Sequence, residues 1–236
     1  DGIRDSVASR GLGDVYKRQT MILVESSALS SSNVTLGMGG LGSITIGNGW
    51  AGVGGNYDDM TPRAYEENHD GMKTATAIDS MGSLLDGNVV HYTSPSFDLG
   101  GATASFQLGY TPEAGDAATG EGGVAAQSAK YGSGTEAGVK VSMMGLTVGA
   151  YGMEVENDQG KSARNRNPMN ATWYANYSFG PVSVGYQEAY QNSANGGEDN
   201  EAEFMGIAYT AGDLSVSYGE SSLTNHGICL LYTSPS

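Results

Sequence analysis

The chain has 236 residues, a formal net charge of −15 and 37 glycines, and its 14 tyrosines outnumber the 4 phenylalanines and 2 tryptophans. This composition is not that of a helix-rich globular domain, and so acidic a chain repels nucleic acid, which argues against a role in binding nucleic acid. No run of about 18 apolar residues is present, so the sequence predicts no transmembrane helix.

The two ends of the chain are predicted to be foreign to the protein between them. Asp14–Gln19 can be encoded by GAT GTG TAT AAG AGA CAG, and the complementary strand in a shifted frame encodes Cys-Leu-Leu-Tyr-Thr, the sequence at 229–233. A single inverted DNA element therefore accounts for both ends, and it looks like the translated adapter of a transposase-based sequencing library. We expect residues 1–19 and 226–236 to be adapter-derived, and residues 20–225 to be a protein segment that is open at both sides.

Without these ends, the chemistry that the sequence allows is narrower. The only cysteine, Cys229, falls away, so segment 20–225 has no disulfide and no thiolate nucleophile or metal ligand. Four of the 11 basic and three of the 26 acidic residues lie in 1–19, which leaves 7 bases and 23 acids and a net charge of −16 (7 − 23). The length of the segment permits one domain.

Apolar and polar residues alternate with a period of two along most of the chain, which predicts β-strands. The alternating segments are 102–110, 137–143, 173–179, 182–186, 205–210 and 214–218. Tight turns at 143–145, 179–181 and 211–213 alternate with polar loops at 114–135, 157–168 and 191–200. Short turns at one end and long loops at the other, joined by strands of about 9–11 residues, are typical of an outer-membrane barrel. The sequence therefore predicts an all-β fold, an antiparallel transmembrane β-barrel.

A soluble β-sandwich also has alternating strands, and two details favour the barrel. The polar face is rich in Gly, Ser and Thr and carries few of the long charged side chains that cover a solvated sheet. The apolar face is flanked by tyrosines that are expected to form an aromatic girdle at the membrane interface, namely Tyr92, Tyr110, Tyr174, Tyr190 and Tyr209.

A long segment without alternation, residues 50–86, interrupts this pattern. A loop of this length in a compact domain is usually functional. Thr61 and Pro62 have the residue types of an N-cap and first position, so they predict a short helix that ends near Asp70. The loop is strongly acidic: it contains Asp58, Asp59, Glu66, Glu67, Asp70, Asp79 and Asp86 against only Arg63 and Lys73.

Two stretches resemble the general diffusion porins. Residues 33–49, NVTLGMGGLGSITIGNG, resemble the hairpin that precedes the constriction loop of that family, and residues 88–97, NVVHYTSPSF, resemble the strand that follows the loop. The chain is similar to the purple-bacterial and marine alphaproteobacterial branch over most of residues 20–225. The resemblance implies a barrel of about sixteen strands, of which roughly ten or eleven are present here, so the first and last strands are expected to be cut off.

The resemblance also implies a function. The protein is expected in the bacterial outer membrane, in contact with lipid and lipopolysaccharide, as a homotrimer that passes small hydrophilic solutes and ions without a cofactor and without binding nucleic acid. Loop 50–86 would narrow the pore, with Asp58, Asp59, Arg63, Glu66, Glu67, Asp70, Lys73 and Asp79 at the constriction. Gln107 and Lys140 alternate with apolar residues and are expected on the pore wall, although Lys140 could equally lie near the lipid headgroups. The acidic excess of the loop predicts a preference for cations.

Two further interpretations belong to other classes of function, and one basic loop has two interpretations of its own. A secreted or surface-attached acidic β-rich protein, acting in adhesion or calcium binding, fits the composition, and Asp58–Asp59 or the acidic run Glu198–Glu203 could supply calcium ligands. An enzyme on a smaller barrel lacks a catalytic constellation in the sequence. The basic loop with Lys161, Arg164 and Arg166 is either a solvated loop or a site for lipopolysaccharide phosphates.

Overall fold

The computed structural model describes residues 32–48, 52–64, 89–112, 114, 131–157, 166–192 and 199–226. These residues form eleven β-strands and two short 3-10 helices. The strands are β1 (Ser32–Gly37), β2 (Ser43–Asn48), β3 (Val89–Thr93), β4 (Phe97–Asp98), β5 (Ala102–Thr111), β6 (Tyr131–Met143), β7 (Leu146–Asn157), β8 (Met169–Phe179), β9 (Val182–Gln191), β10 (Asp199–Ala211) and β11 (Leu214–His226). The 3-10 helices are η1 (Gly39–Leu41) and η2 (Gly54–Asn56).

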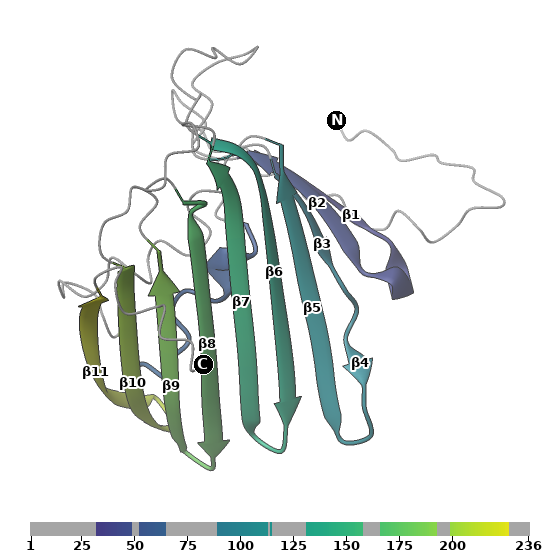
Figure 1. Ribbon diagram of the computed structural model, residues 1–236. Helices are drawn as coiled ribbons and strands as arrows, with labels where there is room; N and C mark the ends of the chain where they lie inside the picture. The colour runs from purple at the N-terminus through teal and green to yellow at the C-terminus, as the bar shows by residue number, and fades with distance from the viewer. Residues whose placement is uncertain are drawn as a thin grey trace, which may run out of the picture.

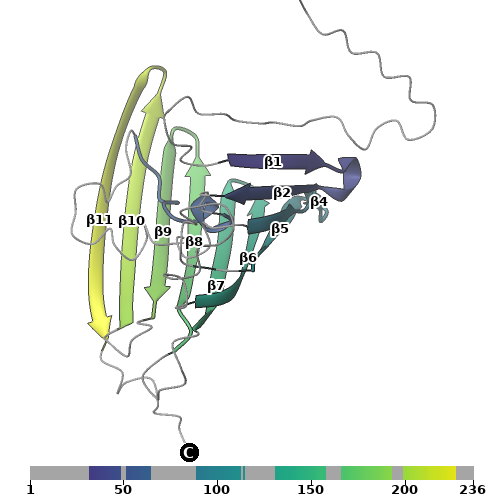
Figure 2. The same cartoon turned by 90° about the horizontal axis from the view of Figure 1, so that it is seen from above.

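All eleven strands belong to one antiparallel sheet (Figure 1). Its order is β1-β2-β3-β5-β6-β7-β8-β9-β10-β11, with β4 paired to β5. Viewed from above, the strands follow a curve, and η2 lies on its concave side (Figure 2). The prediction of an all-β antiparallel fold is confirmed. Within the described part of the chain, no helix has the length and hydropathy needed to cross a membrane.

The three tight turns predicted from the sequence connect β6 to β7, β8 to β9 and β10 to β11. Each contains a glycine with a positive φ, a backbone conformation that residues with a Cβ atom rarely adopt. These glycines are Gly145 (84°), Gly180 (57°) and Gly212 (59°). Because these two-residue connections leave no slack, they fix the register of each hairpin. The strands are longer than predicted at the opposite end, where β6 already begins at Tyr131 within the loop expected over 114–135.

The stretch that resembles a single porin strand, residues 88–97, is broken by Pro95. A proline has no N–H to donate to a sheet, so β3 ends before it and β4 begins after it, and both strands pair with β5. Ser94 bridges the gap, since its backbone N–H donates to Phe106 O (2.9 Å) and its hydroxyl accepts from Phe106 N (2.8 Å). The chain therefore stays against β5 across the break.

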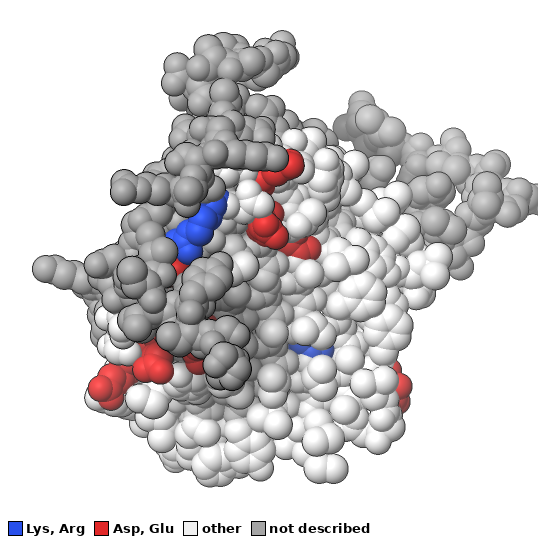
Figure 3. Space-filling model, viewed as in Figure 1, with Lys and Arg blue, Asp and Glu red and all other residues white. Residues whose placement is uncertain are grey.

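The two faces of the sheet differ in composition as the alternation predicts. Large apolar side chains on the convex face are exposed, for example Val139, Val141 and Ile207. Figure 3 shows this face: uncharged surface covers most of its middle and lower part, and the acidic side chains lie mainly toward the upper edge and the left-hand side. Such an uncharged band suits contact with lipid hydrocarbon.

The predicted tyrosine girdle needs one correction. Tyr110 and Tyr209 are exposed on the convex face, at 49% and 45% of their surface. Tyr174 instead points to the concave face and is fully buried. Its neighbour Trp173 occupies the outward position, because successive side chains of a strand alternate between faces.

Candidate pore constriction

The segment that follows β2 folds back against the concave face of the sheet. Residues 52–64 are the described part of the loop predicted over 50–86. Their contacts follow the wall in chain order, from β6 at the beginning of the segment to β11 at its end. We call residues 52–64 the inner strap.

The beginning of the inner strap is held by Glu136, an inward residue of β6 whose side chain is fully buried. Its two carboxylate oxygens accept hydrogen bonds from the backbone N–H groups of Val53 (3.0 Å) and Gly54 (3.1 Å). The hydroxyl of Tyr151 donates a third hydrogen bond (2.9 Å). His91 Nε2 lies 3.0 Å from the carboxylate. Since a buried carboxylate is costly unless it is satisfied, these contacts explain why Glu136 can lie inside the wall.

The middle of the inner strap is held by Gln187, an inward and fully buried residue of β9. Its Oε1 accepts a hydrogen bond from Met60 N (2.8 Å), and its Nε2 donates to the carbonyls of Tyr57 (2.7 Å) and Asp58 (2.8 Å). Asn176 on β8 donates from its side-chain amide to Met60 O. Both backbone polar groups of Met60 are therefore bound by side chains of the wall.

Glycines on the wall make room for the inner strap. A Cβ atom at Gly138 would lie 2.5 Å from the ring of Tyr57, and one at Gly185 would lie 2.4 Å from Pro62 Cδ. Both distances are too short for real contacts, so only glycine allows the strap to lie this close to the sheet. The strap and the wall are thus complementary in shape as well as in hydrogen bonding.

Tyr57 anchors the apolar part of this contact. Its ring stacks on Tyr151 with centroids 5.6 Å apart, and it lies 6.3 Å from the ring of Tyr174. Burial, with a smaller contribution from Tyr174, raises the pKa of Tyr57 to about 12. The phenol is therefore neutral across the physiological range of pH.

The inner strap ends near the far edge of the described sheet. The backbone N–H of Ala64 donates to the hydroxyl of Ser217 on β11 (3.0 Å). No helix begins at Thr61, which corrects the helix predicted there, since residues 61–64 form a bend at each end with irregular chain between them. The wall instead binds the backbone N–H groups of Met60 and Ala64, through Gln187 and Ser217 respectively. The rest of the predicted helix lies outside the described residues.

Of the predicted constriction residues, the structure describes Asp58, Asp59 and Arg63. The Arg63 guanidinium contacts the Asp59 carboxylate and also donates to Asp59 O (2.9 Å). The Asp58 carboxylate accepts a hydrogen bond from Asp59 N (2.8 Å). Glu66, Glu67, Asp70, Lys73 and Asp79 lie outside the described residues.

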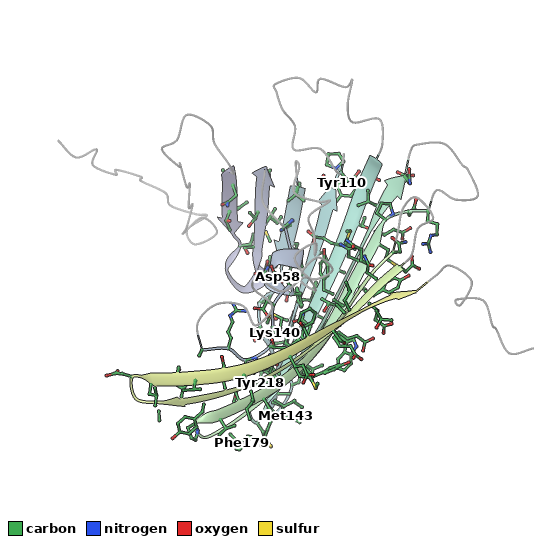
Figure 4. The ribbon with its side chains drawn as sticks, turned by 90° about the vertical axis from the view of Figure 1, so that its left-hand side faces the viewer. Asp58, Tyr110, Lys140, Met143, Phe179 and Tyr218 are labelled. Carbon is green, nitrogen blue, oxygen red and sulfur yellow. The ribbon has the colours of Figure 1, made fainter. Side chains whose placement is uncertain are left out.

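The two predicted wall residues both lie on the concave face. Lys140 shares this face with Glu136 and Gly138, and it pairs across the sheet with Ser105 and Gly149. In Figure 4, Lys140 and Asp58 lie at an intermediate height between Tyr110 and Met143. Gln107 donates from its side-chain amide to Thr93 Oγ1 (3.3 Å). Its amide is therefore engaged with the neighbouring strand.

Near the tight turns, the concave face is lined by paired hydroxyl groups. Each of the three hairpins carries one pair at the same position, five residues apart in sequence: Ser142 and Thr147 (3.0 Å), Ser178 and Ser183 (2.9 Å), and Thr210 and Ser215 (2.7 Å). Such uncharged polar groups suit a wall in contact with water. Cross-strand pairs of this kind also stabilise each hairpin by roughly 0.2–1 kcal/mol.

Neither group of residues read as possible calcium ligands forms such a site in the described structure. Asp59 is paired with Arg63. Asp199 is fully buried and contacts the Arg166 guanidinium and the Tyr190 hydroxyl. Across the described ranges, no set of three or more His, Cys, Asp or Glu side chains is arranged to hold a metal ion. The Arg166 contact also means that this arginine of the basic loop already binds a carboxylate.

The sequence interpretation missed the residues that hold the inner strap. Asn176 was only one polar position of the alternating segment 173–179, and Glu136 and Gln187 lay just outside the predicted segments 137–143 and 182–186. The small size of neighbouring residues could have pointed to them. Each shares its face of the sheet with Gly138 or Gly185, where another segment of the chain can approach the wall closely.

Together, these features define a class of protein. A curved antiparallel sheet with an apolar convex face, a polar concave face and a loop folded against the inside is the wall of a membrane channel built from strands. The chain belongs to the Gram-negative porin family, whose sequence model matches residues 25–227. The protein is therefore a porin of the bacterial outer membrane and not an enzyme. A comparison with curated protein sequences gave no match.

Proposed function

We propose that this porin is of the general diffusion type and passes small hydrophilic solutes and ions through a water-filled pore that loop 50–86 narrows. The observation that carries this proposal is the attachment of the inner strap to the concave wall through the buried side chains of Glu136 and Gln187. A loop that binds the inside of a barrel at several points must occupy part of its lumen.

The pore is proposed to favour cations. Loop 50–86 carries seven acids against two bases in its sequence, and charges in a narrow aqueous channel act strongly on passing ions because they are incompletely screened. Lys140 is the one Lys or Arg in the described strands, and it lies on the concave face, where it would oppose this preference. The seven acidic residues of the loop outnumber this single lysine.

Reversal potentials in a salt gradient across planar bilayers test the selectivity. Since the first and last strands are expected to lie outside this chain, the complete gene product is used. Replacing Glu66, Glu67 and Asp70 by their amides should reduce the preference for cations. The matched control changes Glu154, Glu156 and Glu220, acids exposed on the convex face, to glutamine. Anion selectivity of the unmodified porin, or equal effects of both triple changes, would contradict the proposal.

The remaining features concern the assembly. We propose that the porin is a homotrimer, embedded in lipid and lipopolysaccharide, that needs no cofactor. Its exposed convex face with an uncharged band supports the contact with lipid. Detergent gels run with and without boiling test the trimer, since a heat-sensitive band at three times the monomer mass is expected.

A further inference from the structure

Gln187 binds the inner strap in a way that depends on both polar atoms of its side chain. We propose that Gln187 is the positioning residue that sets how far the loop projects into the lumen, and hence the width of the pore. This inference rests on the proposed constriction. It assigns the width of the pore to one contact of the wall and not to the loop alone.

The contact is specific to an amide. Within four consecutive residues of the strap, Gln187 meets two acceptors, Tyr57 O and Asp58 O, and one donor, Met60 N. A carboxylate could accept from Met60 N but would face two carbonyl oxygens without a proton to donate, and an alkyl side chain would satisfy none of the three. Glutamine alone among residues of this length supplies both functions.

The amide is itself held in orientation by the neighbouring strand. Gln187 Nε2 also lies 3.0 Å from Thr172 Oγ1, and that hydroxyl donates to Glu188 O (2.7 Å). Because the hydroxyl proton of Thr172 is used in this second bond, its oxygen faces Gln187 as an acceptor. The oxygen and nitrogen of the Gln187 side chain are thereby assigned, with the nitrogen toward Thr172 and the oxygen toward Met60.

The position of Gln187 along the strap explains why it would control width. Glu136 fixes the beginning of the strap at Val53 and Gly54, whereas Gln187 fixes residues 57–60. If the Gln187 contact is lost, the strap is still held at its beginning by Glu136, at Met60 O by Asn176 and at its end by Ser217, but the segment from Tyr57 to Met60 N loses three hydrogen bonds and can bow away from the wall. A strap that is free to move should no longer hold the loop in one place.

The test compares Gln187→Leu with Ser183→Ala, on the same strand and the same face, whose hydroxyl contacts Ser178 and no residue of the strap in the described structure. In the complete porin, Gln187→Leu should change the single-channel conductance and the size limit for neutral polymers, and should make the open-channel current noisier. Ser183→Ala should leave all three unchanged. Heat-modifiability on detergent gels shows that each variant is folded.

A second measurement does not depend on conduction. The backbone amide of Met60 should exchange with deuterium roughly tenfold faster in Gln187→Leu, which corresponds to about 1.4 kcal/mol of lost protection. If Gln187→Leu does not fold, Gln187→Glu serves instead, since it keeps the size and one acceptor but loses both donors, and the same changes are expected.

The two proposals fail differently. A wild-type porin that conducts no ions would disprove the proposed function, and the exchange of Met60 would still show whether Gln187 holds the strap. A conducting porin in which Gln187→Leu alters neither conductance nor size limit would overturn the inference and leave the function intact. Unchanged exchange at Met60 would also overturn it.

Discussion

His91 Nε2 lies 3.0 Å from a carboxylate oxygen of Glu136, and the side chains of both residues are almost entirely buried. His91 belongs to β3, the strand that follows the loop, whereas Glu136 also binds Val53 and Gly54 at the beginning of the strap. One carboxylate therefore joins the two ends of the loop to β6. Closing the base of a long loop in this way limits its motion without filling the lumen.

The first prediction concerns this carboxylate. Glu136→Gln removes an acceptor from one of the two backbone N–H groups and turns a donor toward it, so the free energy of unfolding should fall by about 1–3 kcal/mol. The same change at Glu156, which is exposed and accepts from Ser133, should stay within about 0.5 kcal/mol of the wild type. Urea unfolding in lipid vesicles measures both. Equal stability of the two variants would mean that the carboxylate of Glu136 contributes no more than a surface charge.

The second prediction concerns the glycines beneath the strap. Gly138→Val places side-chain atoms where the Tyr57 ring lies, and Gly185→Val does so at Pro62. The strap has to move away from the wall, and crowding of this kind costs about 1–3 kcal/mol. Each variant should alter the single-channel conductance, while Gly37→Ala, at a position with open space around it, should not. Wild-type conductance in both valine variants would show that the strap does not touch these positions in the membrane.

The third prediction concerns Lys140. Replacing this inward lysine by serine should raise the preference for cations, because it removes a positive charge from the wall. The effect should be larger at 0.1 M salt than at 1 M, where the Debye length has fallen from about 10 Å to about 3 Å. Lys140→Arg, which keeps the charge, is the control. Reversal potentials that do not change in Lys140→Ser at either salt concentration would remove Lys140 from the ion path.

The fourth prediction concerns pH. The pKa of Tyr57 is raised from about 10 to about 12 when the strap is bound to the wall. The neutral phenol therefore stabilises the bound strap below about pH 10. This stabilisation is lost as the pH rises from about 10 through about 12, because in this range the phenol ionises only when the strap has left the wall. The conductance of the wild type should therefore change more over this interval than that of Tyr57→Phe. Identical profiles of conductance against pH in the two proteins would show that ionisation of Tyr57 does not affect how the strap binds the wall.

The fifth prediction concerns the ends of the chain. Since one inverted DNA element can encode both, the codons for residues 1–19 and 226–236 should be absent from the genomic locus. Long-read sequencing across the locus provides the measurement. Finding those codons in contiguous genomic DNA would show that they belong to the gene.

The strands could be predicted from the sequence because alternation is local. Segments such as 173–179 reveal their two faces within a few residues, and the glycine turns mark where each hairpin reverses. The acidic character of loop 50–86 was likewise a matter of composition. The prediction placed Tyr174 on the outer face because tyrosine is common in aromatic girdles. Its spacing of two residues from Thr172 and from Asn176 already assigned it to the inner face.

The contacts of the site could not be predicted in the same way. Gln187 lies 127 residues from Met60 in sequence, and Glu136 lies 83 residues from Val53. Nothing in a single sequence shows which inward polar side chain meets which backbone group of a distant loop. The pairing of Arg63 with Asp59, four residues apart, was within reach of local reasoning, and it reduces the charge that this part of the loop offers to passing ions.

These sequence separations also order the events of assembly. The hydroxyl pairs of the three hairpins join residues five apart, so each hairpin can form early and by itself. The inner strap, by contrast, precedes in sequence every strand that holds it, and its last contact, between Ala64 and Ser217, spans 153 residues. The contacts of the strap with the wall cannot be complete until β11 has joined the sheet. A nascent barrel of this protein is accordingly wide first and narrow only at the end.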